Sequence, residues 1–456
     1  MADVIPGIRP KFGSGPPRRP RRRSGLRRRG WAGLRRRGRS GLRQRGWAGS
    51  TARRPGVLLT VLTLLFGVAL AYMVVLKSVF PLEVATQTAP AAASGMTPGA
   101  APEAEGPAVG TALPPATLDS QAPYKLLLAN VLPSGAIKVK PDDDRIIPYF
   151  ANLAAMALLP DRPLDVRDYL QWYLAHLNRP DRFGLYATIY DFAVDDNGFE
   201  QPTQGYDSAD SYAATFLTLL RAYVETTGDR DFVRANLVDI ERVASVILQL
   251  QDSDGLVWAT AARREKYLMD NCEDYRGLDD FAAVMDDLGV SDAAAVVREA
   301  ARRIADGIET RFWDPARGNY DWAIYTFRVL GRKVAEFPRK SSWRQWYPGT
   351  VAQVFPVVTG VLRPSDPRAV SLYASLNARH PGWVNQAKRD PNPWSVLGYA
   401  AALMGDDQRA MAFVRATSAV YLDRTGPYSG LSWELAWHLL TLRLVLNPTA
   451  SVSPTG

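Results

Sequence analysis

The chain has 456 residues, of which 47% are hydrophobic and 22% are charged, and its formal net charge is +9. Residues 1–54 hold 17 Arg and one Lys against a single Asp, so the rest of the chain carries a net charge of −8. That acidic balance argues against nucleic acid as a partner of the later part. The single Cys excludes an intrachain disulfide framework, and only three His argue against a Cys/His zinc site. We therefore expect neither a metal nor a cofactor.

Residues 1–54 form an Arg-rich segment with few large apolar side chains. Such a composition cannot bury a core and predicts a disordered tail. The tail fits either a solvated segment that sets membrane orientation or one that binds anionic lipid head groups or RNA. The first interpretation is the simpler one.

Residues 55–80 contain a run of twenty uncharged, mostly apolar positions, VLLTVLTLLFGVALAYMVVL at 57–76. At about 1.5 Å per residue, a helix of this length spans a hydrocarbon core of roughly 30 Å. Positive charge on the N-terminal side predicts a cytoplasmic N-terminus and a periplasmic or extracellular C-terminal domain. A cleaved signal peptide ending near Ala69-Leu70-Ala71 is the alternative, but the apolar run is longer than such peptides need.

Residues 81–122 contain twelve Ala and seven Pro in 42 positions, which predicts a semi-extended linker. Residues 123–447 have ordinary globular composition and are long enough to bury a core. Residues 448–456 are expected to be a disordered tail. The chain is thus predicted to hold one folded domain behind a single membrane anchor.

Helical periodicity of two kinds alternates through the domain. Val297, Ala301, Ile304 and Ile308 recur every three or four residues between charged ones, which predicts an amphipathic helix with one face in solvent. Segments 206–224 and 393–404 are instead apolar or small nearly all round. These segments predict helices that are buried on most sides.

Turns with a glycine followed by an aromatic-rich extended pair separate the helices. Each interval between them accommodates a helical hairpin, and a first hairpin is predicted at 143–178. Five hairpins with a closing helix at 431–446 predict an all-α fold, a closed toroid of two concentric helical layers. An open α-solenoid is the structural alternative. The turn glycines are Gly184, Gly255, Gly318, Gly382 and Gly430.

The domain resembles the six-hairpin, (α/α)6-barrel glycosidase superfamily over residues 125–447. The resemblance lies in the hairpin lengths, the turns and three inner-helix openings, DSADSYAATFL at 207–217, DNCEDYRGLDDFAAV at 270–284 and YPGTVAQVFPVVTGVL at 347–362. It implies the (α/α)6 toroid and a carbohydrate-active site. No signature of one particular family is present, so no catalytic residue is carried over.

The inner helices of a toroid point their N-termini toward one end, so the residues that open them surround a cavity. Carboxylates and aromatic residues dominate these positions. Glycoside hydrolysis needs two carboxyl groups, and sugar rings pack against aromatic faces. The candidate catalytic residues are Asp207, Asp210, Glu273, Asp274 and Glu434. The candidate substrate-binding residues are Tyr206, Asp270, Asn271, Trp343, Arg344, Trp346, Tyr347, Trp394 and Trp433.

Several of these residues also fit structural roles. Asp207 and Asp210 could cap a helix or interact with its dipole. A helix cap requires one acid, but residues 270–274 hold three. Their mutual repulsion would raise the pKa of at least one of them. Glu434, which lies among tryptophans, fits either an acid in an apolar pocket or a solvent-facing side chain. Arg344 fits either the carboxylate of an acidic sugar or a structural ion pair.

These features predict a membrane-anchored glycoside hydrolase that acts on an extracytoplasmic polysaccharide by carboxylate acid/base catalysis. A non-catalytic carbohydrate-binding or polysaccharide-assembly factor on the same scaffold is the main alternative. A polysaccharide lyase is a third, for which Tyr206, Tyr212, Asn271 and Arg344 could supply parts. The hydrolase requires two carboxyl groups at a common cavity.

Overall fold

A computed structural model describes residues 120–262, 265–329, 332–385, 392–423 and 426–446. The predicted tail at 1–54, the anchor at 55–80 and the tail at 448–456 lie outside these residues, as does nearly all of the linker at 81–122. Among the described helices, none combines the length and the apolar character needed to cross a bilayer.

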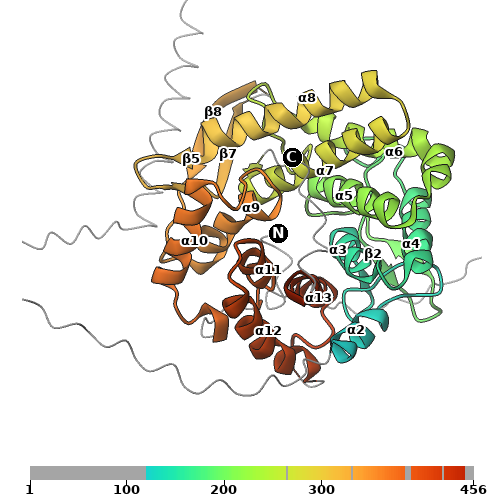
Figure 1. Cartoon of the computed structure of the whole chain (residues 1–456). Helices are drawn as coiled ribbons and strands as arrows, with labels where there is room; N and C mark the ends of the chain where they lie inside the picture. The colour runs from blue at the N-terminus through green and yellow to red at the C-terminus, as the bar shows by residue number, and fades with distance from the viewer. Residues whose placement is uncertain (1–119, 263–264, 330–331, 386–391, 424–425, 447–456) are drawn as a thin grey trace, which may run out of the picture. The chain divides into compact units, whose positions relative to one another are not determined.

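Six inner helices form a closed ring in the described part of the chain (Figure 1). Each contacts the next, and the last, α13, contacts the first, α3. This closure confirms the toroid and excludes the open solenoid. The inner helices are α3 (Pro148–Leu158), α5 (Ala209–Thr227), α7 (Leu268–Asp287), α9 (Phe355–Val358), α11 (Val396–Leu403) and α13 (Ser432–Leu446).

An outer layer of helices surrounds this ring (Figure 1). The outer helices are α2 (Gln121–Leu128), α4 (Pro163–Ala175), α6 (Arg230–Leu250), α8 (Ser291–Gly307), α10 (Pro367–Arg379) and α12 (Asp407–Leu422). Helix α2 packs against α13. The first and last helices of the described domain therefore form the sixth helical pair of the ring. The sequence pattern indicates only five hairpins and an unpaired closing helix, because α2 is short and follows directly on the Pro/Ala linker.

The two helix types differ in burial as predicted. Helix α5 is buried continuously from Ala209 to Leu217, whereas α8 buries one stripe that includes Val297, Ala301 and Ile304. An inner helix contacts both its ring neighbours and the outer layer, so it has no solvent face. The alternation of hydrophobic patterns therefore follows directly from the two layers.

Short strands add to the helices, so the fold is mostly helical rather than all-α. One sheet joins β1 (Arg145–Ile146), β2 (Phe192–Val194) and β3 (Glu200–Pro202). A second joins β4 (Glu265–Tyr267), β7 (Ala323–Val329) and β8 (Arg332–Arg339), and β5 (Trp313–Asp314) pairs with β6 (Asn319–Tyr320). Single-turn helices η1 (Ile308–Phe312), η2 (Trp346–Thr350), η3 (Val351–Val354) and η4 (Trp383–Asn385) occupy connections. The sequence at 318–325 indicates only a turn, so the β7–β8 hairpin is not predicted from it.

The turn at Gly255 offers a test of how tightly the two layers pack. Its φ is +88°, and an added Cβ would lie 2.1 Å from the carbonyl oxygen of Arg303. Gly318 also has a positive φ, +64°, but no heavy atom within 4 Å of an added Cβ. Gly255→Ala should therefore lower the free energy of unfolding by about 3 kcal/mol, and Gly318→Ala by about 1 kcal/mol. Urea unfolding followed by circular dichroism measures both, and equal losses would contradict the close approach at Gly255.

Candidate active site

Four carboxyl groups gather where two neighbouring inner helices begin. Asp210 lies in the first turn of α5, and Asp270, Glu273 and Asp274 lie in the first two turns of α7. All four are buried. Within the described residues, no Lys, Arg or His forms an ion pair with Asp210, Glu273 or Asp274. The sequence-predicted acids of these two helices therefore form one buried acidic cluster.

The acidic cluster has an outer and an inner part. Asp270 and Glu273 keep 4% and 7% of their surface exposed, whereas Asp210 and Asp274 keep none. The Tyr149 hydroxyl donates to Glu273 Oε1 over 2.5 Å, and the Ser208 hydroxyl donates to Asp270 Oδ2 over 2.7 Å. Burial, with the charge of Asp270 second, raises the pKa of Glu273 to about 8. Glu273 is thus a protonated acid at neutral pH.

The inner pair, Asp210 and Asp274, has few hydrogen-bond donors. Asp210 Oδ1 accepts from the Ser211 backbone N–H over 2.8 Å. Asp210 Oδ2 and both oxygens of Asp274 find no donor among the described side chains and backbone groups. Burial raises the pKa of both carboxyls well above the ordinary range, and for Asp274 the charge of Asp210 comes next. A proton held on this pair lets one carboxyl donate to the other.

Asp191 is a further titratable carboxyl that sequence reasoning missed. It precedes β2 and is partly buried, and its Oδ1 accepts from the Tyr212 hydroxyl over 2.9 Å. Burial raises the pKa of Asp191 to about 7. The Tyr212 ring faces that of Tyr149 with centroids 6.3 Å apart and planes 30° apart. Glu273 and Asp191 are therefore each bonded to one of two facing tyrosines. Asp191 lies in a loop without a helix-start pattern, which is why the sequence did not mark it.

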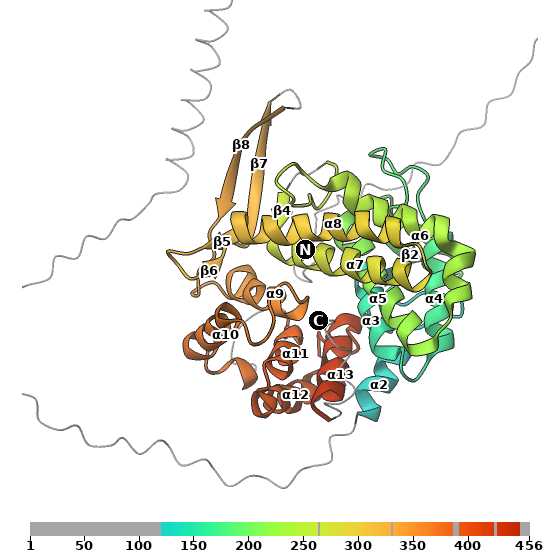
Figure 2. The ribbon, with the colours of Figure 1, turned by 45° about the horizontal axis from the view of Figure 1, so that its top comes forward.

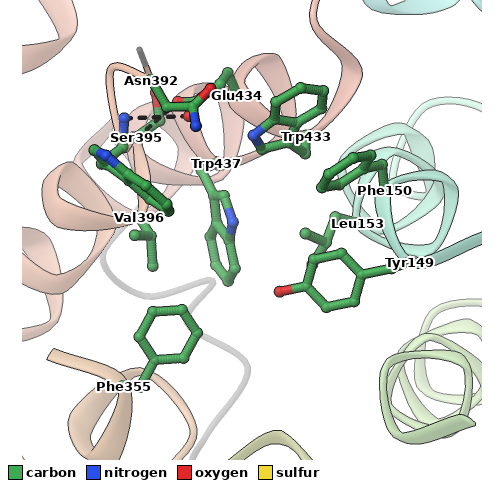
Figure 3. Close-up of a pocket in the computed structure, with 11 residues that line it drawn as sticks. Tyr149, Phe150, Leu153, Phe355, Asn392, Ser395, Val396, Trp433, Glu434 and Trp437 are labelled. Atoms are coloured by element: carbon green, nitrogen blue, oxygen red, sulfur yellow. Dashed lines mark hydrogen bonds between the residues drawn. The ribbon is translucent and has the colours of Figure 1, made fainter. Parts of the chain in front are cut away.

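An aromatic pocket of about 560 Å³, open solvent included, has Tyr149 in its wall (Figure 3). Because Tyr149 is bonded to Glu273, this pocket lies beside the acidic cluster. The Tyr149 hydroxyl points from α3 into this pocket (Figure 3). Phe150 stacks on Trp433 with centroids 4.0 Å apart, and Tyr347 stacks on Trp394 at 4.3 Å. These two stacks give the pocket flat apolar surfaces of the kind that sugar rings contact. Its lining residues are Tyr149, Phe150, Leu153, Phe355, Asn392, Trp394, Ser395, Val396, Trp433, Glu434 and Trp437.

Glu434 lines the pocket, but its carboxylate oxygens already accept hydrogen bonds from other groups of the domain. They accept from the backbone N–H groups of Trp394 and Ser395 at 3.1 and 2.8 Å (Figure 3). They also accept from the Tyr421 hydroxyl at 3.0 Å. These bonds attach the start of α11 to the start of α13. The carboxylate thus positions the aromatic pocket wall, and its predicted catalytic role stays a prediction.

The remaining predicted residues lie around the site rather than in the pocket. The Tyr206 hydroxyl donates to Asp181 Oδ2 over 2.6 Å, and Asp207 is half-buried just before α5. The Asn271 amide is bonded to the backbone of Val257 and Tyr267, so it attaches a turn to α7. Its predicted substrate-binding role stays a prediction. The loop before α9 carries Trp343, Arg344 and Trp346.

Apart from the acidic cluster, the described residues hold a group of three carboxylates, and it is this group that has the spacing of a metal site. It consists of Asp252, Asp254 and Glu336. The ammonium group of Lys266 lies among them, 2.8 Å from Asp252 Oδ2, 2.8 Å from Asp254 Oδ2 and 3.2 Å from Glu336 Oε1. A lysine therefore fills the position that a cation would take.

A closed ring of six helical hairpins with carboxyls and aromatic residues at one end defines the six-hairpin, glycosidase-like fold. No known family profile matches the chain, and no curated protein sequence does. Solved structures do match. A wild-type glycosidase and a glycosidase variant in complex with glucose are each 13% identical, with a TM-score of 0.51, over 72% of this chain and 95% of theirs. An uncharacterized conserved protein from Thermus thermophilus is 14% identical, with a TM-score of 0.51, over 70% of this chain and 99% of its own. At these identities the likeness establishes the fold.

The raised pKa values of the inner pair predict how the stability of the domain depends on pH. A buried carboxyl with a raised pKa stabilises the folded state below the unfolded pKa of about 4, and this contribution is lost as pH rises through the folded pKa. Asp274→Asn removes the ionisation while keeping the shape. We therefore expect the variant to melt at least about 3 °C above the wild type at pH 8, with a smaller gain at pH 5.

Differential scanning calorimetry across pH 5–8 measures this gain. Asp231→Asn is the matched control, because that carboxyl is 94% exposed and should show no pH-dependent gain. A wild-type melting temperature that does not fall relative to Asp274→Asn between pH 5 and pH 8 would contradict a proton on the pair.

Proposed function

We propose that this protein is a glycoside hydrolase. The observation that carries the proposal is Glu273, a buried carboxyl that is protonated at neutral pH and bonded to a tyrosine of the aromatic pocket wall. Glycosidic bond cleavage requires such an acid to protonate the leaving oxygen. The neighbouring aromatic pocket suits the apolar faces of a sugar ring.

The reaction needs a second carboxyl in its ionised form. We assign this role to Asp191, whose lower pKa of about 7 leaves it ionised while Glu273 still holds its proton. The facing tyrosines orient both groups, because each hydroxyl donates to one carboxyl. In this assignment Glu273 donates to the departing sugar oxygen, and Asp191 activates water or stabilises the developing positive charge.

The hydrogen bonds and raised pKa values of Tyr206 and Tyr212 disfavour the lyase alternative. A lyase needs a tyrosine that loses its proton easily to act as a base. The hydroxyls of Tyr206 and Tyr212 instead donate to carboxylates, and burial raises the pKa of both. The non-catalytic carbohydrate-binding factor keeps the same aromatic pocket, so activity measurements must separate it from the hydrolase.

Hydrolysis of a polysaccharide panel by the wild-type protein tests the proposal. We expect Glu273→Gln and Asp191→Asn each to lower kcat/KM by about 10²–10⁴-fold, as for the loss of a general acid or base. The wild-type profile should rise through about pH 7 as Asp191 ionises and fall above about pH 8 as Glu273 loses its proton. Reducing-sugar release against pH measures both effects.

Glu241→Gln and Asp196→Asn are the matched controls, because both side chains are exposed. They should leave activity and its pH profile unchanged. Full activity in Glu273→Gln would overturn its role as the acid. Binding without hydrolysis across the panel would instead favour the carbohydrate-binding factor.

We further propose that residues 57–76 anchor the protein in a membrane, with the Arg-rich tail in the cytoplasm and the domain outside it. The apolar run and the charge asymmetry support this arrangement. It would hold the enzyme close to a polysaccharide of the cell envelope. The tail would lie next to anionic lipid head groups.

Membrane fractionation tests the anchor. The wild-type chain should stay in the pellet after alkaline carbonate extraction. Leu64→Arg with Leu65→Arg should release most of it, because each Arg costs about 2.5–3.5 kcal/mol at the centre of a span. Thr63→Ser is the control and should remain in the pellet. A wild-type protein that has lost its first 71 residues would favour the signal-peptide alternative.

A further inference from the structure

The β7–β8 hairpin projects away from the ring of helices (Figure 2). Tyr325 pairs with Phe337 across the strands, and Phe327 pairs with Ala335. Directly opposed residues share one face of a sheet, as do residues two apart, so these aromatic side chains lie on one face. Phe327 and Phe337 are each 54% exposed. Exposed aromatic rings that share one face of a sheet form an apolar patch, and such patches mark interaction sites.

The aromatic face continues toward the ring of helices. Tyr267 on β4 contacts the Tyr325 ring edge-to-face at 6.5 Å and stacks on Trp322 at 6.2 Å. The Arg339 guanidinium lies 4.4 Å from the centre of the Tyr325 ring. We call this surface the hairpin platform, and its residues are Tyr267, Trp322, Tyr325, Phe327, Phe337 and Arg339.

The other face of the hairpin is attached to the domain by buried charge. Glu336 pairs with Thr326, so it points away from the hairpin platform. It bonds Lys266, which is fully buried and also bonds Asp252 and Asp254 in the turn after α6. Arg311 adds a further contact to Glu336 at 2.5 Å. A buried ion network of this kind holds its parts in one geometry, so the hairpin platform is rigidly mounted.

The hairpin platform leads into the candidate active site. Tyr267 immediately precedes α7, whose first turns carry Asp270 and Glu273. The Leu268 backbone N–H donates to the carbonyl oxygen of Trp322 over 3.0 Å. The inner end of the hairpin platform is therefore within one helical turn of the acidic cluster.

The hairpin differs in charge from the rest of the domain. Residues 323–340 carry more Arg and Lys than Glu, although the chain after residue 54 has a net charge of −8. Lys333 and Lys340 are paired with carboxylates. Within the described residues, Arg339 and Arg344 have no ion-pair partner. Both remain available to an anionic ligand that lies along the hairpin and reaches the loop before α9.

We propose that the hairpin platform binds the extended chain of an anionic polysaccharide and guides it into the active site. The aromatic rings contact the apolar sugar faces, and Arg339 and Arg344 pair with carboxylates of uronate residues. The inference rests on the proposed function in naming its substrate class. A uronate polymer supplies the two features that this surface would contact: flat apolar sugar faces for the aromatic rings and regularly spaced negative charge for the arginines.

Affinity electrophoresis of the full chain through gels containing alginate or neutral dextran tests this inference. All proteins carry Glu273→Gln, so that binding is measured apart from hydrolysis. We expect retardation by alginate, a loss of apparent affinity of about tenfold in Phe327→Ala/Phe337→Ala and about fivefold in Arg339→Gln, and weaker binding at high salt. Leu164→Ala and Arg363→Gln are the controls, because both side chains are exposed beside the opposite ends of the inner helices.

Unchanged alginate binding in both hairpin variants would overturn the inference, as would equal retardation by dextran. Stronger binding to phosphatidylglycerol vesicles than to alginate, lost in the same variants, would overturn it in favour of a membrane contact. The hydrolase proposal fails on a different measurement, namely the hydrolytic activity of the wild type and of the Glu273 and Asp191 variants. Alginate binding through the hairpin platform by a protein that hydrolyses nothing would separate the two.

Discussion

The inner ring closes because α13 packs against α3, so the inner helices enclose a common interior and their first turns meet at one end. Carboxyls from α5 and α7 then share a volume that excludes water, with Asp210 and Asp274 fully buried. Like charges cannot all ionise there, so protons are retained at neutral pH. The same geometry places aromatic residues of α3 and α13, and Trp394 just before α11, next to these acids. Without closure, neither the raised pKa values nor the aromatic pocket would arise.

Two buried groups of carboxylates in this domain are stabilised in opposite ways. Around Lys266, three carboxylates surround one ammonium group, and the pKa of Asp252 is held well below its usual range. In the acidic cluster, Glu273 has no such cation among the described residues and its pKa rises to about 8. The first arrangement holds a hairpin in place and has no proton to exchange. The second retains a transferable proton and lowers stability, as expected where a fold carries chemistry.

Much of the fold could be predicted from the sequence because the two helical layers impose different hydrophobic patterns. The acids of α5 and α7 could be singled out because helical spacing brings them to one face. Asp191 and Tyr149 could not, since the contacts that define them join residues far apart in the chain. The β7–β8 hairpin was missed because its alternation is short and follows directly on a turn. The structural bonds of Glu434 and Asn271 could not be predicted either, because their oxygens accept from backbone N–H groups of other segments.

Local composition and periodicity account for three properties of this protein. They are the alternation of buried and half-exposed helices, the concentration of acids and aromatics at inner-helix starts, and the charge asymmetry between the first 54 residues and the rest. Three others arise only when the chain folds: which acids share a low-dielectric volume, which carboxylates are occupied by structural bonds, and which aromatic rings stay exposed. Those outcomes depend on distances between segments that lie far apart in the chain, and periodicity carries no information about such distances.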